Sequence, residues 1–141
     1  SKSYLNVKSG NFTLIMNDKT TAEVNLQAEN ATLELSKSAQ IKALIASPEV
    51  KIDMYQKTIA VIEGDAANAK IRLDNNAAFT GRKFSVKNME LITESYTTNS
   101  INALETISIT ATGKSQTQLL GTPKVTVVNF ADSAIIYKKE Q

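Results

Sequence analysis

The stretch Asn30-Ala31-Thr32-Leu33-Glu34-Leu35 decides the fold, because its pattern returns at near-constant spacing along the chain. Six-residue segments of the same form begin at residues 11, 30, 49, 68, 88, 106 and 124, so the steps between them are 19, 19, 19, 20, 18 and 18 residues. A period near 20 residues is typical of repeat architectures, in which each repeat is one structural unit. The sequence therefore predicts seven stacked units.

Apolar and polar residues alternate within these seven segments. The second, fourth and sixth positions are apolar at 19 of 21 sites, Thr93 and Asn129 being the exceptions. The third and fifth positions are apolar at only 3 of 14 sites. A period of two is the mark of a β-strand with one face buried and the other exposed to water. Each unit is expected to contribute one such strand.

A strand that recurs in this way belongs either to a stack of coils or to a meander of hairpins. Hairpin turn signals usually fall about every 8 to 12 residues, so the longer, near-constant spacing favours coils. We predict an all-β fold: a single-domain parallel β-helix (solenoid) of about seven coils with 18–20 residues per coil. Residues 1–141 would form the domain, with coils from about residue 11 to residue 139. Right-handed winding is the default for parallel crossovers.

Stacking at about 4.8 Å per coil would bring the fourth positions into one interior column. This column contains Leu14, Leu33, Ile52, Ile71, Leu91, Ile109 and Val127. A second apolar strand is expected about half a coil later. It is carried by Val24 and Leu26, Ile41 and Ala43, Ile59 and Val61, Phe84 and Val86, Ile101 and Ala103, Leu119, and Ile135.

The segments between the strands are expected to form corners. Asn opens four of the seven segments, at Asn11, Asn30, Asn68 and Asn88. Asn tolerates the left-handed conformation at a sharp corner, and stacked Asn amides can bond along a column. Gly64 to Asn68 is also interpreted as a corner, and residues 75–82 as the widest loop. Residues 38–47 have an alternative interpretation as a short helix, since Ile41, Leu44 and Ile45 share one face at helical spacing.

Composition excludes several function classes. The 141 residues contain 16 Lys and Arg against 14 Asp and Glu, a net charge of +2 that is spread along the chain. Nucleic acids and anionic membranes favour concentrated positive charge, so neither is expected as a partner. The chain has no Cys and no His, which removes thiol nucleophiles, disulfides and most zinc, copper and haem ligation. No apolar run is long enough to span a bilayer.

The C-terminal part resembles a known family. Gly121-Thr122-Pro123-Lys124-Val125, between a strand ending in Leu119-Leu120 and a closing strand Ile135-Ile136-Tyr137-Lys138-Lys139, is similar to the Gly-Asn-Pro-Lys-Val ending of the putative auto-transporter adhesin head (GIN domain) family. Its members are mostly bacterial, exported β-helices. The likeness extends from about Asn11 to Lys139, although Ser-Gly-Ser-Gly corners are missing and the chain holds only five Gly. The resemblance implies a divergent member with an extracytoplasmic location. Because the chain begins without Met, an export signal is expected to have been removed or to lie outside this sequence.

Two groups of charged residues on the outward side are the candidate sites. Glu34 and Asp53, on adjacent strands, offer oxygen ligands for Ca²⁺, but Lys51, Lys70 and Arg72 beside them favour salt bridges along the sheet instead. Asp53, Arg72 and Asp74 together suggest a polysaccharide lyase or hydrolase, which needs paired carboxyls or an acidic cluster with a base. Asp74 is equally well explained as a corner residue.

Exposed aromatic side chains are a further possibility for sugar binding, because their rings can stack on sugars. Tyr55 and Phe130 follow their strands at outward positions, and Tyr96 lies in a loop. They fall on different coils, so we do not assign a binding site to them. The polar, lysine-containing ends, 1–8 and 138–141, are expected to discourage end-to-end stacking of exposed strand edges.

These observations predict a non-catalytic bacterial surface or periplasmic module for adhesion or assembly, with no catalytic, cofactor-binding or metal-binding residue. Its partner would be a protein or a glycan at a surface. The main alternative is a carbohydrate-binding or polysaccharide-cleaving β-helix, and a third hypothesis is a structural module of a larger surface assembly. A glycan array and a depolymerisation assay distinguish them.

Overall fold

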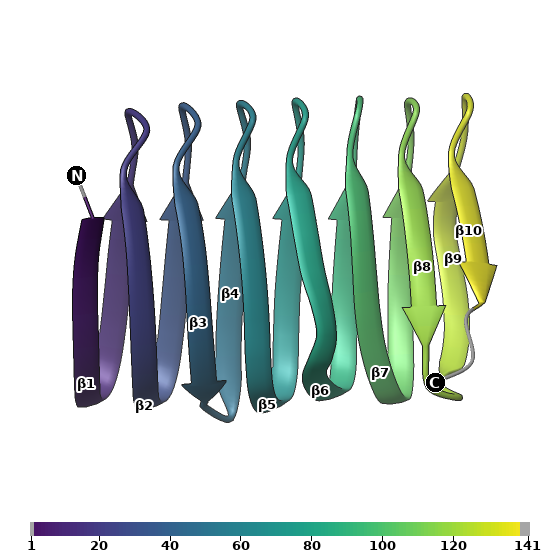
Figure 1. Cartoon of the computed structure of the whole chain (residues 1–141). Helices are drawn as coiled ribbons and strands as arrows, with labels where there is room; N and C mark the ends of the chain where they lie inside the picture. Colours follow the sequence, from purple (N-terminus) through teal and green to yellow (C-terminus); the bar gives the residue numbers. More distant parts are fainter. Residues whose placement is uncertain (1, 139–141) are drawn as a thin grey trace.

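The computed structural model describes residues 2–138 as a stack of ten β-strands, with no helix in that range (Figure 1). The strands are β1 (Lys2–Met16), β2 (Thr21–Leu35), β3 (Gln40–Ala46), β4 (Glu49–Met54), β5 (Ile59–Leu73), β6 (Ala78–Thr93), β7 (Thr98–Ala111), β8 (Gln116–Leu120), β9 (Lys124–Phe130) and β10 (Ile135–Lys138). All ten strand pairings are parallel. Partners are usually 19 residues apart, as in the pair Leu14 and Leu33. The predicted parallel β-helix of about seven coils is confirmed.

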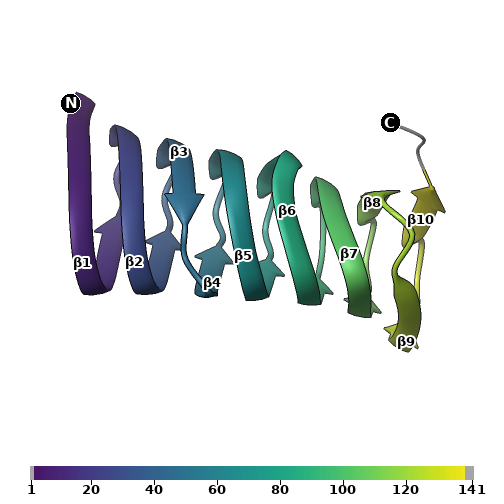
Figure 2. The ribbon, with the colours of Figure 1, turned by 90° about the horizontal axis from the view of Figure 1, so that it is seen from below.

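Each coil is flattened into two layers, and the longer strands bend to contribute to both (Figures 1 and 2). The first layer holds residues 2–9, 21–28, 40–46, 59–66, 78–86, 98–104, 116–120 and 135–138. The second layer holds residues 11–16, 30–35, 49–54, 68–73, 88–93, 106–111 and 124–130. The stack therefore begins at Lys2, earlier than the expected start at residue 11, while residue 139 lies outside the described residues. The hydrophobic core lies between the layers.

The predicted interior column is present in the second layer. Each member from Leu14 to Val127 is the direct register partner of the next. Its five middle members, Leu33, Ile52, Ile71, Leu91 and Ile109, are 0% exposed. Full burial follows because each side chain is covered by the same position of the coil on either side.

Seven corners of four residues connect the second layer to the first. The second residue of every corner has a positive φ: Asp18, Lys37, Gln56, Asn75, Ser95, Gly113 and Asp132. Asn, Asp and Gly favour this conformation, but Lys37 and Gln56 also adopt it here. The fourth residue is small in every corner, and from the second corner onward it is buried: Ala39, Thr58, Ala77, Thr97, Ser115 and Ala134. Small side chains allow the corners to stack closely.

The bends on the opposite side are gentler. The Asn residues that open the second-layer strands do not adopt positive φ, so the left-handed part of that prediction was wrong. Gly64 lies inside β5 rather than in a corner, and its φ of +117° places a would-be Cβ 2.0 Å from the backbone oxygen of Ile45. Only glycine fits that close approach. Pro48 separates β3 from β4, because proline has no N–H for the ladder.

In the first layer, the predicted phase was wrong at two places. Ala60 and Ile62 are buried and pair with Ile41 and Ala43, whereas Ile59 is 44% exposed. Four consecutive apolar residues, 59–62, carry no alternation, so the larger side chains misled the interpretation. Ile135 is likewise outward and exposed, and its neighbour Ile136 packs against the core.

Where a coil has residues beyond the usual 19, the extra residues form bulges within strands rather than longer loops. Residues 75–82 do not form a wide loop: Asn75 and Asn76 belong to a four-residue corner, and β6 begins at Ala78. The ladder between β6 and β7 instead shifts between Thr80 and Ser85, which is a β-bulge. The alternative helix at 38–47 is wrong, because residues 40–46 form β3.

A second bulge lies in the last coil. Asn129, rather than Val128, pairs with Thr110, and Phe130 takes the interior position opposite Ala111. This explains why Asn129 broke the apolar pattern, since the extra residue shifts the phase by one. At this end of the stack the interior-type residues Val125, Val127 and Phe130 are 43%, 51% and 48% exposed.

Candidate interaction face

The outward side chains of the second layer form a surface that we call the polar face. Its upper row, next to the bends, contains Asn11, Asn30, Glu49, Asn68, Asn88 and Thr106. Its middle row contains Thr13, Thr32, Lys51, Lys70, Glu90 and Ser108. Its lower row, next to the corners, contains Ile15, Glu34, Asp53, Arg72, Ile92 and Thr110. The middle and lower rows are the third and fifth positions of the six-residue segments, which the alternation predicted to be exposed, whereas the Asn residues of the upper row were predicted to lie at corners.

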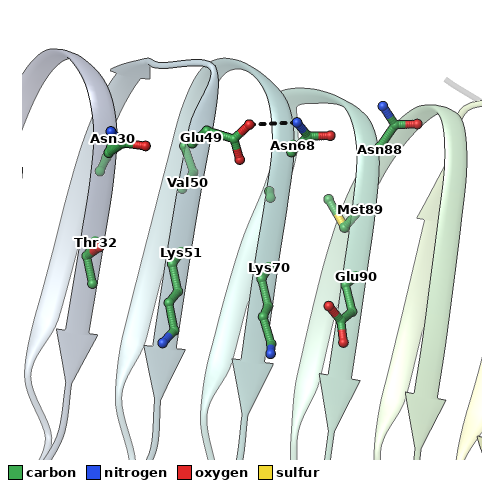
Figure 3. A pocket seen from close by; sticks show the side chains of 12 residues that line it. Asn30, Thr32, Glu49, Val50, Lys51, Asn68, Lys70, Asn88, Met89 and Glu90 are labelled. Carbon is green, nitrogen blue, oxygen red and sulfur yellow. Dashed lines mark hydrogen bonds between the residues drawn. The ribbon is translucent and has the colours of Figure 1, made fainter. Parts of the chain in front are cut away.

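Hydrogen bonds between coils run along the upper row. Asn30 Nδ2 donates to Asn11 Oδ1 at 2.8 Å. Asn68 Nδ2 donates to Glu49 Oε1 at 2.7 Å, the bond drawn in Figure 3. Thr106 Oγ1 donates to the amide oxygen of Asn88 at 2.7 Å. The predicted bonding of stacked amides is therefore confirmed for Asn30 and Asn11, and the row joins successive coils in pairs.

A shallow hollow of about 430 Å³ lies between the upper and middle rows. Figure 3 shows Lys51, Lys70 and Glu90 along one side of it and the Asn–Glu–Asn series along the other. The floor includes Val50, Ala69 and Met89, which face the core. The hollow thus offers amide, ammonium and carboxylate groups from four successive coils to a ligand lying across the strands.

A second hollow, of about 380 Å³, lies at the lower row beside the corners. It brings together Asp53, Arg72 and Asp74, the residues considered for a lyase or hydrolase, with Tyr55 on its rim. Tyr55 is 44% exposed. Asp74 Oδ1 accepts a hydrogen bond of 2.8 Å from the backbone N–H of Asn75, so its carboxylate also stabilises the corner.

The charged groups of this second hollow have neighbours of opposite sign. Lys51 Nζ lies 4.0 Å from Asp53 Oδ2 within one strand. Arg72 donates to Glu94 Oε1 at 3.5 Å. Glu94 was not singled out by the sequence, because it lies 22 residues from Arg72 rather than 19. The register partner of Arg72 is Ile92, which is 20 residues along the chain because β6 has an extra residue. Glu94 lies two residues beyond Ile92, at the first position of the corner after β6.

Glu34 and Asp53 are the carboxylates that the sequence offered as ligands for Ca²⁺. Glu34 and Asp53 are direct register partners, as expected. Within residues 2–138, however, no three Asp or Glu side chains gather closely enough to hold a metal ion.

The other aromatic residues lie apart from this hollow. Tyr96 stands on its corner with Lys114 Nζ 5.5 Å from the ring centroid, a cation–π contact. Phe130 was expected to point outward, but the bulge in β9 moves it to an interior column. At the other end of the stack, Lys2 Nζ lies 5.1 Å from the centroid of the Tyr4 ring. Hydrogen bonding and charge interaction with Tyr4, and then with Glu23, raise the pKa of Lys2 above its ordinary value.

A larger hollow, of about 990 Å³, follows the bends between the layers. Its wall is built mainly from small side chains of successive coils, such as Ala28, Ser47 and Ala66, with Lys8 and Lys87 along it. Polar or charged residues make up eight of its fifteen lining residues, against eight of twelve in the hollow of about 430 Å³ on the polar face. We therefore regard the polar face as the main candidate for recognition.

Comparison with known proteins gives one family. A family model described as putative auto-transporter adhesin, head GIN domain, matches residues 5–123, which cover β1 to β8. No curated protein and no solved structure matches the chain. Residues 2–138 contain no helix with the length and apolarity that crossing a membrane requires.

Proposed function

Because the chain belongs to the putative auto-transporter adhesin head (GIN domain) family, we propose that it is a non-catalytic, extracytoplasmic interaction module whose polar face binds a glycan or protein at a cell surface. The observation that carries this proposal is the polar face itself. It presents three outward rows, with two hollows, across six coils.

The mixture of groups on the polar face supports recognition of a neutral or mixed-charge partner. The face carries charges of both signs in similar number, so no strong field of one sign develops: Lys51, Lys70 and Arg72 against Glu34, Glu49, Asp53 and Glu90. Donors and acceptors repeat at the strand spacing of about 4.8 Å. A partner with repeated polar groups, such as a glycan chain or an extended protein segment, would contact several coils at once.

The rigid support beneath the face also favours binding. The side chains between the rows point into a fully packed core, so the outward groups are held on a fixed backbone. Preorganised groups lose less conformational entropy when a partner binds. The function of the family, described as an adhesin head, is consistent with such a surface.

A glycan array combined with matched variants tests this proposal. Lys70→Ala removes a side chain from the polar face, while Lys42→Ala removes an equally exposed lysine from the outward side of the first layer. Lys70→Ala should weaken binding of an identified partner by about tenfold, which corresponds to the loss of one good charged contact. Lys42→Ala should leave the affinity unchanged. Weakening by Lys42→Ala alone would place recognition on the other layer and overturn the proposal.

The second candidate function is binding or cleavage of a polysaccharide at the lower row. It is favoured by the hollow that gathers Asp53, Arg72 and Asp74 beside the ring of Tyr55. A polysaccharide depolymerisation assay examines it directly. Cleavage that is lost in both Asp53→Asn and Arg72→Ala would replace the non-catalytic proposal with an enzyme.

A structural role in a larger surface assembly gives a third outcome. It predicts binding of a protein partner and no signal on the glycan array. The same Lys70→Ala and Lys42→Ala pair then reports which layer the protein partner contacts.

A further inference from the structure

Of the thirteen exposed large apolar side chains in residues 2–138, six lie in the last coil and two in the first, while the other five are spread over the coils between. Tyr4 and Ile15 in the first coil are 68% and 65% exposed. In the last coil Val127, Val128 and Phe130 are 51%, 65% and 48% exposed. Contiguous exposed apolar side chains mark sites of protein contact more often than single ones do.

Two outward columns differ in polarity between their ends and their middles. One column of the first layer runs Tyr4, Glu23, Lys42, Val61, Thr80, Ser100, Gln118 and Tyr137. The lower row of the polar face begins with Ile15, continues through three charged residues, and reaches Val128 and Asn129 opposite Thr110. The first-layer column thus has a Tyr at each end and a mainly polar middle, whereas the lower row begins with Ile15 and ends at Asn129, beside the bulged Val128.

The two ends also match in backbone and, up to the bulge in β9, in phase. Within residues 2–138, no strand pairs with the outer edge of β1 or with that of β9. The second-layer part of β1 turns Phe12, Leu14 and Met16 inward, and β9 turns Val125, Val127 and Phe130 inward. Every neighbouring pair of strands in the stack joins such positions in parallel. The free edge of β1 therefore has the same inward pattern as β7, the strand with which β9 pairs in its own chain.

Charge allows this contact in the second layer. Residues 11–16 carry no charge, and residues 124–130 carry only Lys124. In the first layer Lys138 is the register partner of the buried Leu119, so a charge stands at an interior column there. Inward-pointing charges at a sheet edge discourage pairing. The contact is accordingly confined to the second-layer strands.

We propose that this chain associates head to tail with a second copy of itself, the Asn11–Met16 part of β1 in one copy pairing in parallel with β9 of the next. This inference is independent of the proposed function of the polar face. A head-to-tail contact is heterologous, because it uses a different surface on each copy, and it builds open filaments rather than closed dimers. The polar faces of successive copies would then join into one longer surface.

Sedimentation velocity of the 141-residue chain over a wide concentration range tests the proposal. The mean mass should rise with concentration and pass that of a dimer. Val127→Lys blocks one end and Leu14→Lys the other, so each variant alone should be monomeric. An equimolar mixture should form a one-to-one dimer, because each variant keeps one intact end. Ile92→Lys, a change in the middle of the same face, should associate like the unmodified chain.

Three outcomes would overturn the proposal. The first is a chain that stays monomeric at every concentration, and the second is an assembly that stops at a dimer. The third is a dimer that survives Leu14→Lys but not Val127→Lys, which indicates tail-to-tail pairing. Circular dichroism confirms that each variant is folded. Ile15→Lys, at a 65% exposed outward position, is the second test of the β1 end and should weaken association by at least about tenfold.

Discussion

Replacing Ile71 by Asp tests the interior column at its centre. Ile71 is 0% exposed and lies between Ile52 and Leu91, which are also fully buried. Truncating such a side chain costs about 2 to 5 kcal/mol of the free energy of unfolding. Burying a polar group without a partner adds about 1 to 3 kcal/mol, and more when the group is charged. The sum is about 3 to 8 kcal/mol before the extra cost of a charge is added, which reaches the whole stability of many domains, about 5 to 15 kcal/mol. Ile71→Asp should therefore unfold the middle of the stack.

The neighbouring substitution Arg72→Asp is the matched control. Arg72 points outward, its side chain is 56% exposed, and it pairs with Glu94 at 3.5 Å. An exposed pair of this kind is worth about 0.2 to 1 kcal/mol. The new carboxylate would also lie beside Asp53, its register partner. Arg72→Asp should therefore lower the free energy of unfolding by only about 1 kcal/mol.

Urea denaturation followed by far-ultraviolet circular dichroism measures both effects. Ile71→Val serves as a conservative control and should cost about 0.5 to 1.5 kcal/mol, because it removes one methylene from the column. Equal destabilisation by Ile71→Asp and Arg72→Asp would show that the inward and outward assignments of this strand are wrong. A folded Ile71→Asp protein with an unchanged midpoint would refute the reasoning about the core as well.

Three further predictions use the same assay. Gly64→Ala should lower the free energy of unfolding by at least about 2 kcal/mol, because its Cβ would lie 2.0 Å from the backbone oxygen of Ile45. The control Gly10→Ala should be near neutral, because no atom lies within 4 Å of its Cβ. Equal effects of the two substitutions would contradict the close approach at Gly64. Thr93→Val should raise stability by up to about 1 kcal/mol, since the buried Thr93 hydroxyl has no hydrogen-bond partner in residues 2–138, and a loss would point to a missed partner. Asn68→Ala should cost about 0.5 to 1.5 kcal/mol by removing a 2.7 Å bond between coils, and no change would show that this bond contributes nothing.

The second layer could be predicted from the sequence because two signals reinforce each other there. Alternation set the inward face of each strand, and the 19-residue spacing set the partner of each residue. Leu33, Ile52 and Ile71 were placed correctly on both grounds. The polar face follows directly, since the residues between inward positions must point outward.

The first layer was harder to predict because its strands carry weaker signals. The run Ile59–Ile62 is apolar throughout, so composition could not distinguish Ala60 and Ile62 from their neighbours. Asn99 and Thr117 are buried polar residues whose side chains bond to each other at 3.1 Å, a pairing that only the folded register creates. The extra residues of β6 were interpreted as part of a loop, and the bulge in β9 shows in the sequence only as the polar exception Asn129.

The candidate site was predicted in part for the same reasons. Asp53 and Arg72 share a column, so their proximity followed from the repeat. Glu94 reaches Arg72 from a corner, where alternation has no meaning, and the hollow beside Tyr55 depends on the shape of two other corners, those of Tyr55 and Asp74. Such features depend on the three-dimensional path of the backbone.

The order of the coils also determines how the molecule would respond to a pulling force. Lys2 lies in the first coil and Lys138 in the last, at opposite ends of the stack (Figures 1 and 2). The hydrogen bonds between coils run along the axis that joins these ends, so tension between the termini loads the bonds of the outermost coil first. Strands held in this geometry separate by unzipping, one coil after another. Each released coil of 19 residues would add about 65 Å of extended chain, which lets the molecule lengthen in steps instead of breaking at once.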